Sequence, residues 1–336
     1  MSKSKILFIP VSGPEGVGEY MRSLILADAV SASLPNISIS FVLSRQAPYA
    51  GECSYPVFLT DESPTKCSSQ VATILHDCRP DVVVFDCSGR AAQYKIAQSL
   101  GAKVIFISQH KKKRKRAFAL NRIGNIDAHC ITQFKFVDGD ISWLERFKLL
   151  LAKKPAPHFI GPVFSEPSAT LPFATASSYV VFSAGGGGHQ INGVRATDVF
   201  IRAANRWCEA SGEECHVLLG PNYQGDALAN TGVYLHKQLK NADLMALIKG
   251  ARVAVLGGGD MLSQAVALKV PSVAIAVAKD QPARVKAIAQ EGLTLKAELS
   301  EESIIRSLKC ETVKPAYAVP AGRERFMAVL QELLSR

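Results

Sequence analysis

The sequence predicts an α/β protein made of two doubly wound, Rossmann-like domains, each built on a parallel sheet. Short, almost uninterrupted hydrophobic runs alternate with helical patterns, the alternation stops at a proline-rich stretch, and it then starts again. The 336 residues are enough for two domains at a typical size of about 150 residues each. A composition of 48% hydrophobic and 20% charged residues is typical of a globular chain and excludes a disordered one.

The first half of the chain contains the strands of the first predicted sheet. Near-continuous hydrophobicity indicates that these strands are buried on both faces, as in a parallel sheet. They are residues 6–11, 37–43, 81–86 and 103–108. Helical patterns lie between them at residues 20–34 and 91–100, and in the first of these Met21, Leu24 and Ile25 share one face.

A linker with three prolines and many small residues interrupts this alternation at residues 161–177. After it we expect strands at 179–183, 215–219, 253–256 and 272–277, with a helix from about Ile191 to Ala210. The last helix has its apolar side chains on one side and is expected to pack against the protein; they are Phe326, Val329, Leu330 and Leu333. The predicted division is therefore a domain of residues 1–161, a linker of 162–178, a domain of 179–320 and a C-terminal helix of 321–336.

Three glycine-rich loops each follow a predicted strand and precede a helix, at residues 12–18, 184–190 and 257–262. Glycine lets the backbone approach a ligand closely, and the amides at the start of the next helix attract phosphate. Each loop taken alone is equally compatible with a tight turn that the fold requires. Three loops in equivalent positions favour a phosphate-bearing ligand.

Standard phosphate and hydrolase motifs are absent from these loops. Residues 188–193 have the glycine spacing of a P-loop but continue with Val-Arg, which disfavours an ATPase. The first loop has Met21 where a dinucleotide fingerprint needs its third glycine, and the second strand ends in Ser44-Arg45 rather than in an acid. No Gly-x-Ser-x-Gly elbow occurs, so a serine hydrolase is not supported either.

Metal and membrane-spanning functions also find little support. The eight cysteines form no Cys-x-x-Cys pair, and Cys208, Cys215 and His216 do not make a convincing zinc cluster. Asp138-Gly-Asp140 is better explained as a turn than as a metal-binding Asp-x-Asp motif. No apolar run reaches the length of roughly 18 to 20 residues that spans a bilayer, and no signal peptide is evident, so we expect a cytoplasmic protein.

The net charge of +10 indicates an anionic partner. A run of six basic residues follows the strand that ends at Ser108; it consists of Lys111, Lys112, Lys113, Arg114, Lys115 and Arg116. Two interpretations stay open: a solvated loop, or a surface that captures an anionic acceptor or the inner face of a membrane. Nucleic acid is disfavoured, because Phe118 is the only aromatic residue close to the run.

The glycine loops and the segments that follow them resemble the GT-B nucleotide-sugar enzymes over nearly the whole chain. Residues 16–27 are similar to the first-loop signature Gly-x-Gly-His-x-x-Arg-x-Leu-x-Leu-Ala of the UDP-sugar hydrolases of pseudaminic-acid synthesis. Residues 258–274 are similar to the donor-site segment of the peptidoglycan N-acetylglucosaminyltransferases, in which a glycine-rich turn precedes a Val-Pro strand. Residues 158–163 resemble the Gly-Asn-Pro-Val segment that leads into the interdomain linker of those enzymes.

This resemblance implies a GT-B-like fold, in which two parallel sheets face each other across a cleft that holds the donor nucleotide. It implies a role in cell-envelope polysaccharide synthesis and no cofactor besides a nucleotide-sugar co-substrate, UDP-linked. The loops and the resemblance together give the candidate donor-binding residues Gly16, Gly18, Gly186, Gly187, Gly188, His189, Gln190, Asn241, Gly258, Gly259, Asp260, Met261, Leu262, Gln264, Asp280 and Gln281.

Two residues depart from the family pattern. Glu19 replaces the first-loop histidine that serves as catalytic base in many relatives, and Gln264 replaces the glutamate that binds ribose. A glutamate can still accept a proton and an amide can still bond a hydroxyl, so Glu19 is the candidate base. The alternative is that Glu19 only complements the dipole of its helix.

We therefore expect a metal-independent glycosyltransferase of the hexosyltransferase type that moves a sugar from a UDP-sugar to an unidentified acceptor. The alternatives are a hydrolase that releases UDP and free sugar, and a nucleotide-sugar-binding protein without catalysis. Glu19 separates these alternatives, because only the two enzymes need a base.

Overall fold

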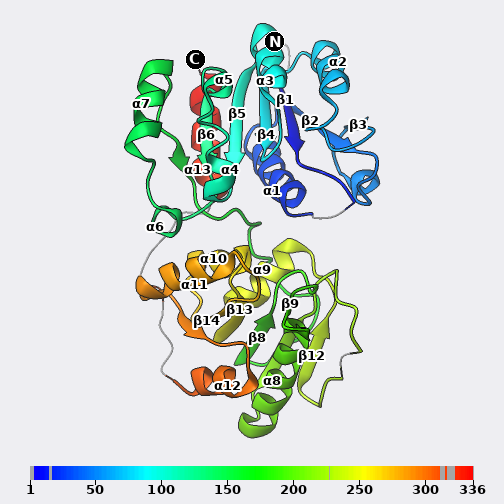
Figure 1. Cartoon of the computed structure of the whole chain (residues 1–336). Helices are drawn as coiled ribbons and strands as arrows, with labels where there is room; N and C mark the ends of the chain where they lie inside the picture. Colours follow the sequence, from blue (N-terminus) through cyan, green and yellow to red (C-terminus); the bar gives the residue numbers. More distant parts are fainter. Residues whose placement is uncertain (1–3, 15–16, 227, 311–314, 316–321, 336) are drawn as a thin grey trace. The chain divides into compact units, whose positions relative to one another are not determined.

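The computed structural model describes residues 4–14, 17–226, 228–310, 315 and 322–335. The chain divides into two compact units (Figure 1). The first unit consists of Met1–Val163 together with Pro320–Arg336, and the second of Phe164–Val319. The C-terminal segment thus returns to the first unit after the second has been completed.

The first unit contains a seven-stranded parallel sheet in the order β3-β2-β1-β4-β5-β6-β7. Its strands are β1 (Ser4–Pro10), β2 (Ile37–Ser44), β3 (Val57–Thr60), β4 (Val82–Asp86), β5 (Lys103–Ser108), β6 (Ala128–Ile131) and β7 (His158–Phe159). The four predicted strands are β1, β2, β4 and β5. Each of these four lies between two other strands, which explains their nearly continuous hydrophobic sequences.

Helices cover this sheet on both faces (Figure 1). They are α1 (Gly18–Ser33), α2 (Ser68–Cys78), α3 (Ala91–Ser99), α4 (Lys111–Arg114), α5 (Leu120–Ile123), α6 (Lys135–Asp138), α7 (Trp143–Ala152) and α13 (Gly322–Leu334), with the 3₁₀ turn η1 (Ala50–Glu52). The predicted apolar side of α13 joins the same core as Ile6 and Phe8 of β1; it comprises Phe326, Val329, Leu330 and Leu333. The expectation that this helix packs is confirmed.

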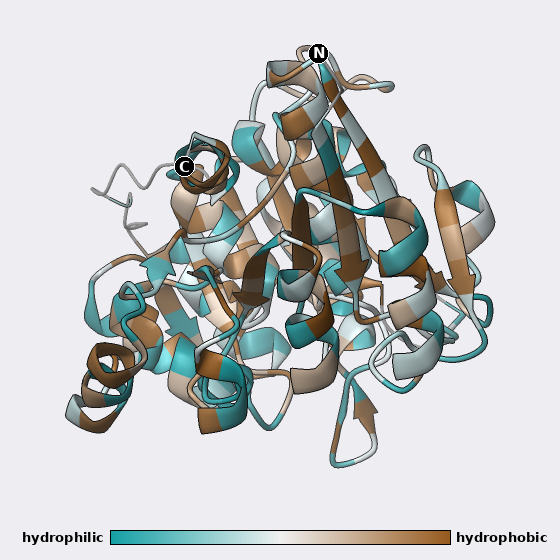
Figure 2. Cartoon of the chain, turned by 90° about the horizontal axis from the view of Figure 1, so that it is seen from above, coloured by the Kyte–Doolittle hydropathy of each residue, from teal (hydrophilic) through white to brown (hydrophobic). Residues whose placement is uncertain are grey.

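The second unit repeats the architecture with a six-stranded parallel sheet in the order β12-β11-β8-β13-β14-β15. Its strands are β8 (Tyr179–Ser183), β11 (Glu214–Leu218), β12 (Val233–His236), β13 (Val253–Gly257), β14 (Ser272–Ile275) and β15 (Leu295–Ala297). Its helices are α8 (Ala196–Ser211), α9 (Asn241–Gly250), α10 (Asp260–Ala267), α11 (Gln281–Gln290) and α12 (Glu301–Lys309). In the chain as a whole, hydrophobic residues dominate the strands, whereas helices carry both hydrophobic and hydrophilic residues (Figure 2).

The predicted start of one helix, α8, is wrong. The helix expected from Ile191 starts at Ala196, because a small hairpin of β9 (Gln190–Ile191) and β10 (Val194–Arg195) comes first. Its two turn residues, Asn192 and Gly193, have φ values of 50° and 78°. Asn-Gly is the preferred sequence for such a left-handed hairpin turn, and this local signal overrides the apolar pattern.

Among the residues that the structure describes, no helix combines the length and the apolar character that crossing a bilayer requires.

Candidate functional site

Both sheets have a point at which the chain reverses its direction of winding. In the first unit it lies between β1 and β4, and in the second between β8 and β13. Ligands of doubly wound proteins bind at such points, outside the carboxyl ends of the strands. The three glycine loops predicted from the sequence follow β1, β8 and β13, so all of them lie at these two points.

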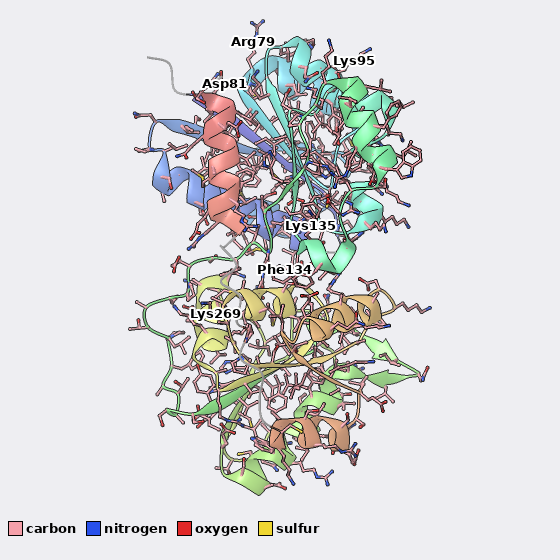
Figure 3. All side chains as sticks on the ribbon, turned by 90° about the vertical axis from the view of Figure 1, so that its left-hand side faces the viewer. Arg79, Asp81, Lys95, Phe134, Lys135 and Lys269 are labelled. Carbon is pink, nitrogen blue, oxygen red and sulfur yellow. The ribbon has the colours of Figure 1, made fainter. Side chains whose placement is uncertain are left out.

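The carboxyl edge of the first sheet is marked by Phe134 and Lys135, which follow β6, whereas Arg79 and Asp81 mark the opposite edge before β4 (Figure 3).

In the second unit the loop after β8 is shaped by close backbone packing. Gly185 and Gly187 have φ values of 98° and 86°, in the left-handed region that favours glycine. A Cβ on Gly187 would stand 2.4 Å from the carbonyl oxygen of Leu219, and one on Gly220 would stand 2.5 Å from the carbonyl oxygen of Gly185. The loop after β8 therefore lies directly against the loop after β11, and glycine is required for this contact.

The loop after β13 joins the same arrangement. A Cβ on Gly257 would come within 2.9 Å of the carbonyl oxygen of Ala184, so the second loop touches the first. Arg284 of α11, which is 8% exposed, donates from Nη1 to the carbonyl oxygen of Gly258 at 2.9 Å. The two glycine loops are thus held side by side at the switch point of the second unit.

Helix α10 begins directly at this point. Gly259 is its N-cap residue and provides no side chain to bond the first amides of the helix. The first turn carries the partial positive charge of the helix dipole, and its amides are oriented toward the loops. Gly258 and Gly259 are followed by Asp260, which is exposed, and Met261, which is half-buried. This arrangement suits the binding of a phosphate group.

Some predicted residues lie at these loops. Gly186 and Gly188 are exposed, and the imidazole Nε2 of His189 would lie 3.7 Å from a Cβ on Gly185. Gln190 is exposed in the first strand of the small hairpin, and Gln264 is half-buried on α10.

Two of the other predicted donor-binding side chains are buried in the structure. Leu262 is fully buried and Gln281 is only 5% exposed. Gln281 accepts a hydrogen bond through Oε1 from the amide of Val277 at 2.9 Å and so shapes the turn between β14 and α11. The Gln281 side chain lies against the glycine loop after β13, with its Nε2 4.0 Å from the position of a Cβ on Gly259, whereas the side chain of Asp280 is 72% exposed.

Asn241 has a structural partner. Its Oδ1 accepts a hydrogen bond from the amide of Ser165 at 2.9 Å, and Asp243 accepts one from the hydroxyl of Ser168 at 2.6 Å. The start of α9 therefore fastens the first residues of the second unit.

Sequence reasoning missed a polar cluster next to the loop after β8. The hydroxyl of Tyr223 donates to Asp198 at 2.7 Å, and Arg195 lies 3.6 Å from the same carboxylate. The Arg195 guanidinium also lies over the ring of Tyr223, 5.8 Å from its centroid. Asn222 packs against Gly188, with its Cβ 3.5 Å from the position of a Cβ there. The signal for this third loop was Gly220-Pro221, a turn that follows the neighbouring strand β11.

The first unit presents Glu19 at its own switch point, in the first turn of α1. The carboxylate is 25% exposed and lies 4.0 Å from the Nζ of Lys113. Gly18 begins the helix, and nothing lies within 4 Å of a Cβ placed on it. Gly16, the other predicted glycine of this loop, lies outside the described residues.

A buried ion pair holds α1 against β4. Arg22 donates from Nε to Oδ2 of Asp86 at 2.8 Å and from Nη2 to Oδ1 at 2.5 Å, and Ser23 donates to the same carboxylate at 3.3 Å. Asp86 is completely buried. Burial raises the pKa of Asp86, and the positive charge of Arg22 opposes this effect. The pair fixes the start of α1, and with it the position of Glu19.

The basic run is not a uniform solvated stretch, because Arg114 is buried within it. Arg114 is 1% exposed and donates to the carbonyl oxygens of the 138–140 turn, at 2.9 Å to Gly139 and at 3.3 to 3.4 Å to its two neighbours. Burial, together with the charge of Arg114, lowers the pKa of the neighbouring His129 to about 3. Arg114 therefore anchors a turn, whereas Lys111, Lys112, Lys115 and Arg116 are exposed and Lys113 is half-buried.

Comparison with known proteins shows the fold to which these features belong. Neither a protein-family model nor a curated protein matches the chain. Among solved structures, a putative UDP-N-acetylglucosamine 2-epimerase from Listeria monocytogenes is similar with a TM-score of 0.65 and 12% identity, over 99% of this chain and 97% of that one. MurG from Acinetobacter baumannii is similar with a TM-score of 0.63 and 12% identity, over 98% of this chain and 99% of that one. The glycotransferase of kitacinnamycin is similar with a TM-score of 0.63 and 14% identity, over 100% of this chain and 96% of that one.

The chain therefore has the GT-B fold, along its whole length, and the predicted α/β class with two parallel sheets is confirmed. Its structural neighbours are GT-B nucleotide-sugar enzymes, as the resemblance in the sequence indicated.

Proposed function

We propose that this protein transfers a sugar from a nucleotide-sugar donor, UDP-linked, to an acceptor hydroxyl, with the donor bound by the second unit. The observation that carries the proposal is the pair of glycine loops held together at the β8–β13 switch point, directly before the uncapped start of α10. Loop amides and the helix dipole can stabilise the negative charge on a departing diphosphate without a metal ion.

Glu19 is the base in this proposal. The acceptor oxygen attacks the anomeric carbon, its proton passes to the Glu19 carboxylate, and the bond to the diphosphate breaks with its electron pair leaving on UDP. The first unit is accordingly assigned to the acceptor. If water takes the place of the acceptor, the same chemistry is hydrolysis, and UDP release without an added acceptor distinguishes the two.

The substitution Gly259→Asp tests the donor site. Aspartate is a favourable N-cap residue, so α10 keeps or gains stability. Its carboxylate accepts hydrogen bonds from the first amides of α10, and its charge repels a diphosphate. The Cβ has room, since its nearest neighbour is 4.0 Å away. We expect UDP affinity to fall by about tenfold or more, equivalent to at least about 1.4 kcal/mol, with an unchanged melting temperature. Isothermal titration with a panel of nucleoside diphosphates measures this effect.

The control Gly124→Asp adds the same charge to the first unit at the end of α5, where the backbone has an ordinary helical φ of −66° and nothing lies within 4 Å of the new Cβ. It should leave UDP affinity unchanged. Equal affinity of the Gly259→Asp variant and the unmodified protein would show that the diphosphate does not lie at α10.

A further inference from the structure

Helix α7 of the first unit exposes most of its apolar side chains. The exposed fractions are 79% for Trp143, 74% for Leu150, 66% for Leu151, 51% for Phe147 and 47% for Leu144. No residue of the helix is buried. Soluble proteins rarely expose a contiguous apolar face of this kind unless it binds something.

The spacing of these residues makes a single face. Trp143, Phe147 and Leu150 follow one another at positions i, i+4 and i+7, and therefore form one stripe along the helix. Leu144 and Leu151 extend the stripe on one side. The opposite side of α7 attaches the helix to the protein, because Leu149 and Ala152 pack against a small core of Phe118, Ile123 and Ile141. The helix lies at the outer side of the first unit (Figure 1).

Positive charge lies beside the start of this apolar face. A cavity of about 410 Å³ lies between α4 and the start of α7, and three lysines line it: Lys111, Lys115 and Lys148. Within the described residues, none of these lysines forms an ion pair. Arg114 also lines the cavity, and its buried Nε has no hydrogen-bond partner in the described part of the chain.

The two acidic residues that line this cavity are already bound by other groups of the protein. Asp140 is bound by Lys135 at 2.8 Å and by Arg146 at 2.6 Å, and these contacts hold the pKa of Asp140 below its usual range. Glu145 bonds the amide and the hydroxyl of Ser142 as the cap of α7. The cavity beside the apolar face is therefore a cationic site.

We propose that α7 lies in the surface of an anionic lipid bilayer, with its apolar face among the acyl chains and a lipid phosphate in the lysine-lined cavity. A helix with Trp, Phe and Leu on one face and basic residues at its sides is typical of interfacial membrane binding. Tryptophan is favoured at the level of the headgroups. The ten residues of α7 are too few to span a bilayer, so the helix lies on the membrane rather than across it.

A lipid surface fits this face better than a second copy of the chain does. Two copies joined through α7 would bring the cationic cavities of both together, and like charges would repel one another. An anionic bilayer has negative headgroups that can bind the lysines, and an apolar interior that can cover the exposed side chains of α7. The proposal does not depend on the nucleotide site, which belongs to the other unit.

Vesicle binding tests the proposal. The protein is mixed with phosphatidylcholine vesicles with and without phosphatidylglycerol, and the bound fraction is measured by flotation. We expect binding only to the anionic vesicles, with a shift of Trp143 emission to shorter wavelength. Trp207, the other tryptophan, is buried with only 8% of its surface exposed, so its emission should not shift.

Two triple variants separate the contributions of the apolar face and the charge. Trp143→Ser, Leu150→Ser and Leu151→Ser together should weaken vesicle binding by about tenfold or more. Its matched control replaces three exposed apolar residues elsewhere, Leu59→Ser, Leu228→Ser and Tyr234→Ser, and should bind normally. Lys111→Ser, Lys115→Ser and Lys148→Ser together should remove the preference for anionic lipid, whereas Lys249→Ser, Lys269→Ser and Lys296→Ser together should not.

Three outcomes would overturn the proposal. The unmodified protein fails to bind anionic vesicles, or the α7 variant binds them as well as its control does. The third is a dimer in size-exclusion chromatography that the α7 variant dissolves, which would identify a second copy as the occupant of the face. All variants change exposed or half-buried side chains, and thermal unfolding verifies that each one folds.

Discussion

Replacing Glu19 by glutamine is expected to lower turnover by about 10²- to 10⁴-fold, while UDP affinity stays within a few-fold of its original value. Glutamine preserves the size of the side chain but cannot accept the proton of the acceptor hydroxyl, and loss of a general base has this magnitude. UDP affinity is preserved because the proposed donor loops belong to the second unit. UDP release from UDP-sugars measures turnover, and isothermal titration measures affinity.

A second first-turn glutamate provides the control for this experiment. Glu324 is exposed in the first turn of α13, so Glu324→Gln removes a comparable interaction with a helix dipole. It should leave turnover unchanged. If Glu19→Gln is as active as Glu324→Gln, Glu19 only complements the dipole of α1 and the base is another residue.

Replacing Arg22 by methionine is expected to destabilise the first unit by about 3 to 5 kcal/mol, because it leaves the buried Asp86 carboxylate without its cationic partner. Arg22 donates two hydrogen bonds to Asp86 from a side chain that is 7% exposed. The same change releases the start of α1, so the position of Glu19 should become less defined. Urea unfolding of the purified protein measures the loss of stability.

The double variant Arg22→Met with Asp86→Leu shows whether the unpaired charge is the cause. Replacing a buried ion pair by apolar residues of similar size is often neutral or stabilising, so the double variant should be more stable than Arg22→Met alone. A loss below about 1 kcal/mol for the single variant would mean that water or another group satisfies Asp86, and that the pair does not position α1.

The sequence alone predicts two central features of the fold, the buried parallel strands and the positions of the glycine loops. Buried parallel strands have nearly continuous hydrophobic sequences, so β1, β4 and β5 were recognised, and the glycine loops after β1, β8 and β13 were placed at the ends of strands. Edge strands gave no such signal. β3 and β12 are four residues long and partly exposed, with Leu59 and Tyr234 facing solvent, so hydrophobicity does not mark them.

The site was predicted less completely because burial depends on tertiary contacts. Arg114 has the same sequence context as the lysines beside it, and only the fold shows that it anchors the 138–140 turn. Gln281 follows an exposed aspartate, yet its amide oxygen holds the backbone at Val277. The turn that Arg114 anchors lies 25 residues further along the chain, so the neighbouring sequence gives no sign of it. Likewise, the helical pattern of α7 suggests a buried face, whereas the structure leaves that face exposed.

Photoaffinity labelling with an azido derivative of UDP, followed by mass spectrometry of the labelled peptides, tests the central claim most directly. The claim is that the donor nucleotide binds at the switch point of the second unit. The account predicts labels within residues 184–190, 219–225 or 257–264, which unmodified UDP should prevent by competition. Labels found only before Val163, or no competable label at millimolar UDP, would contradict it.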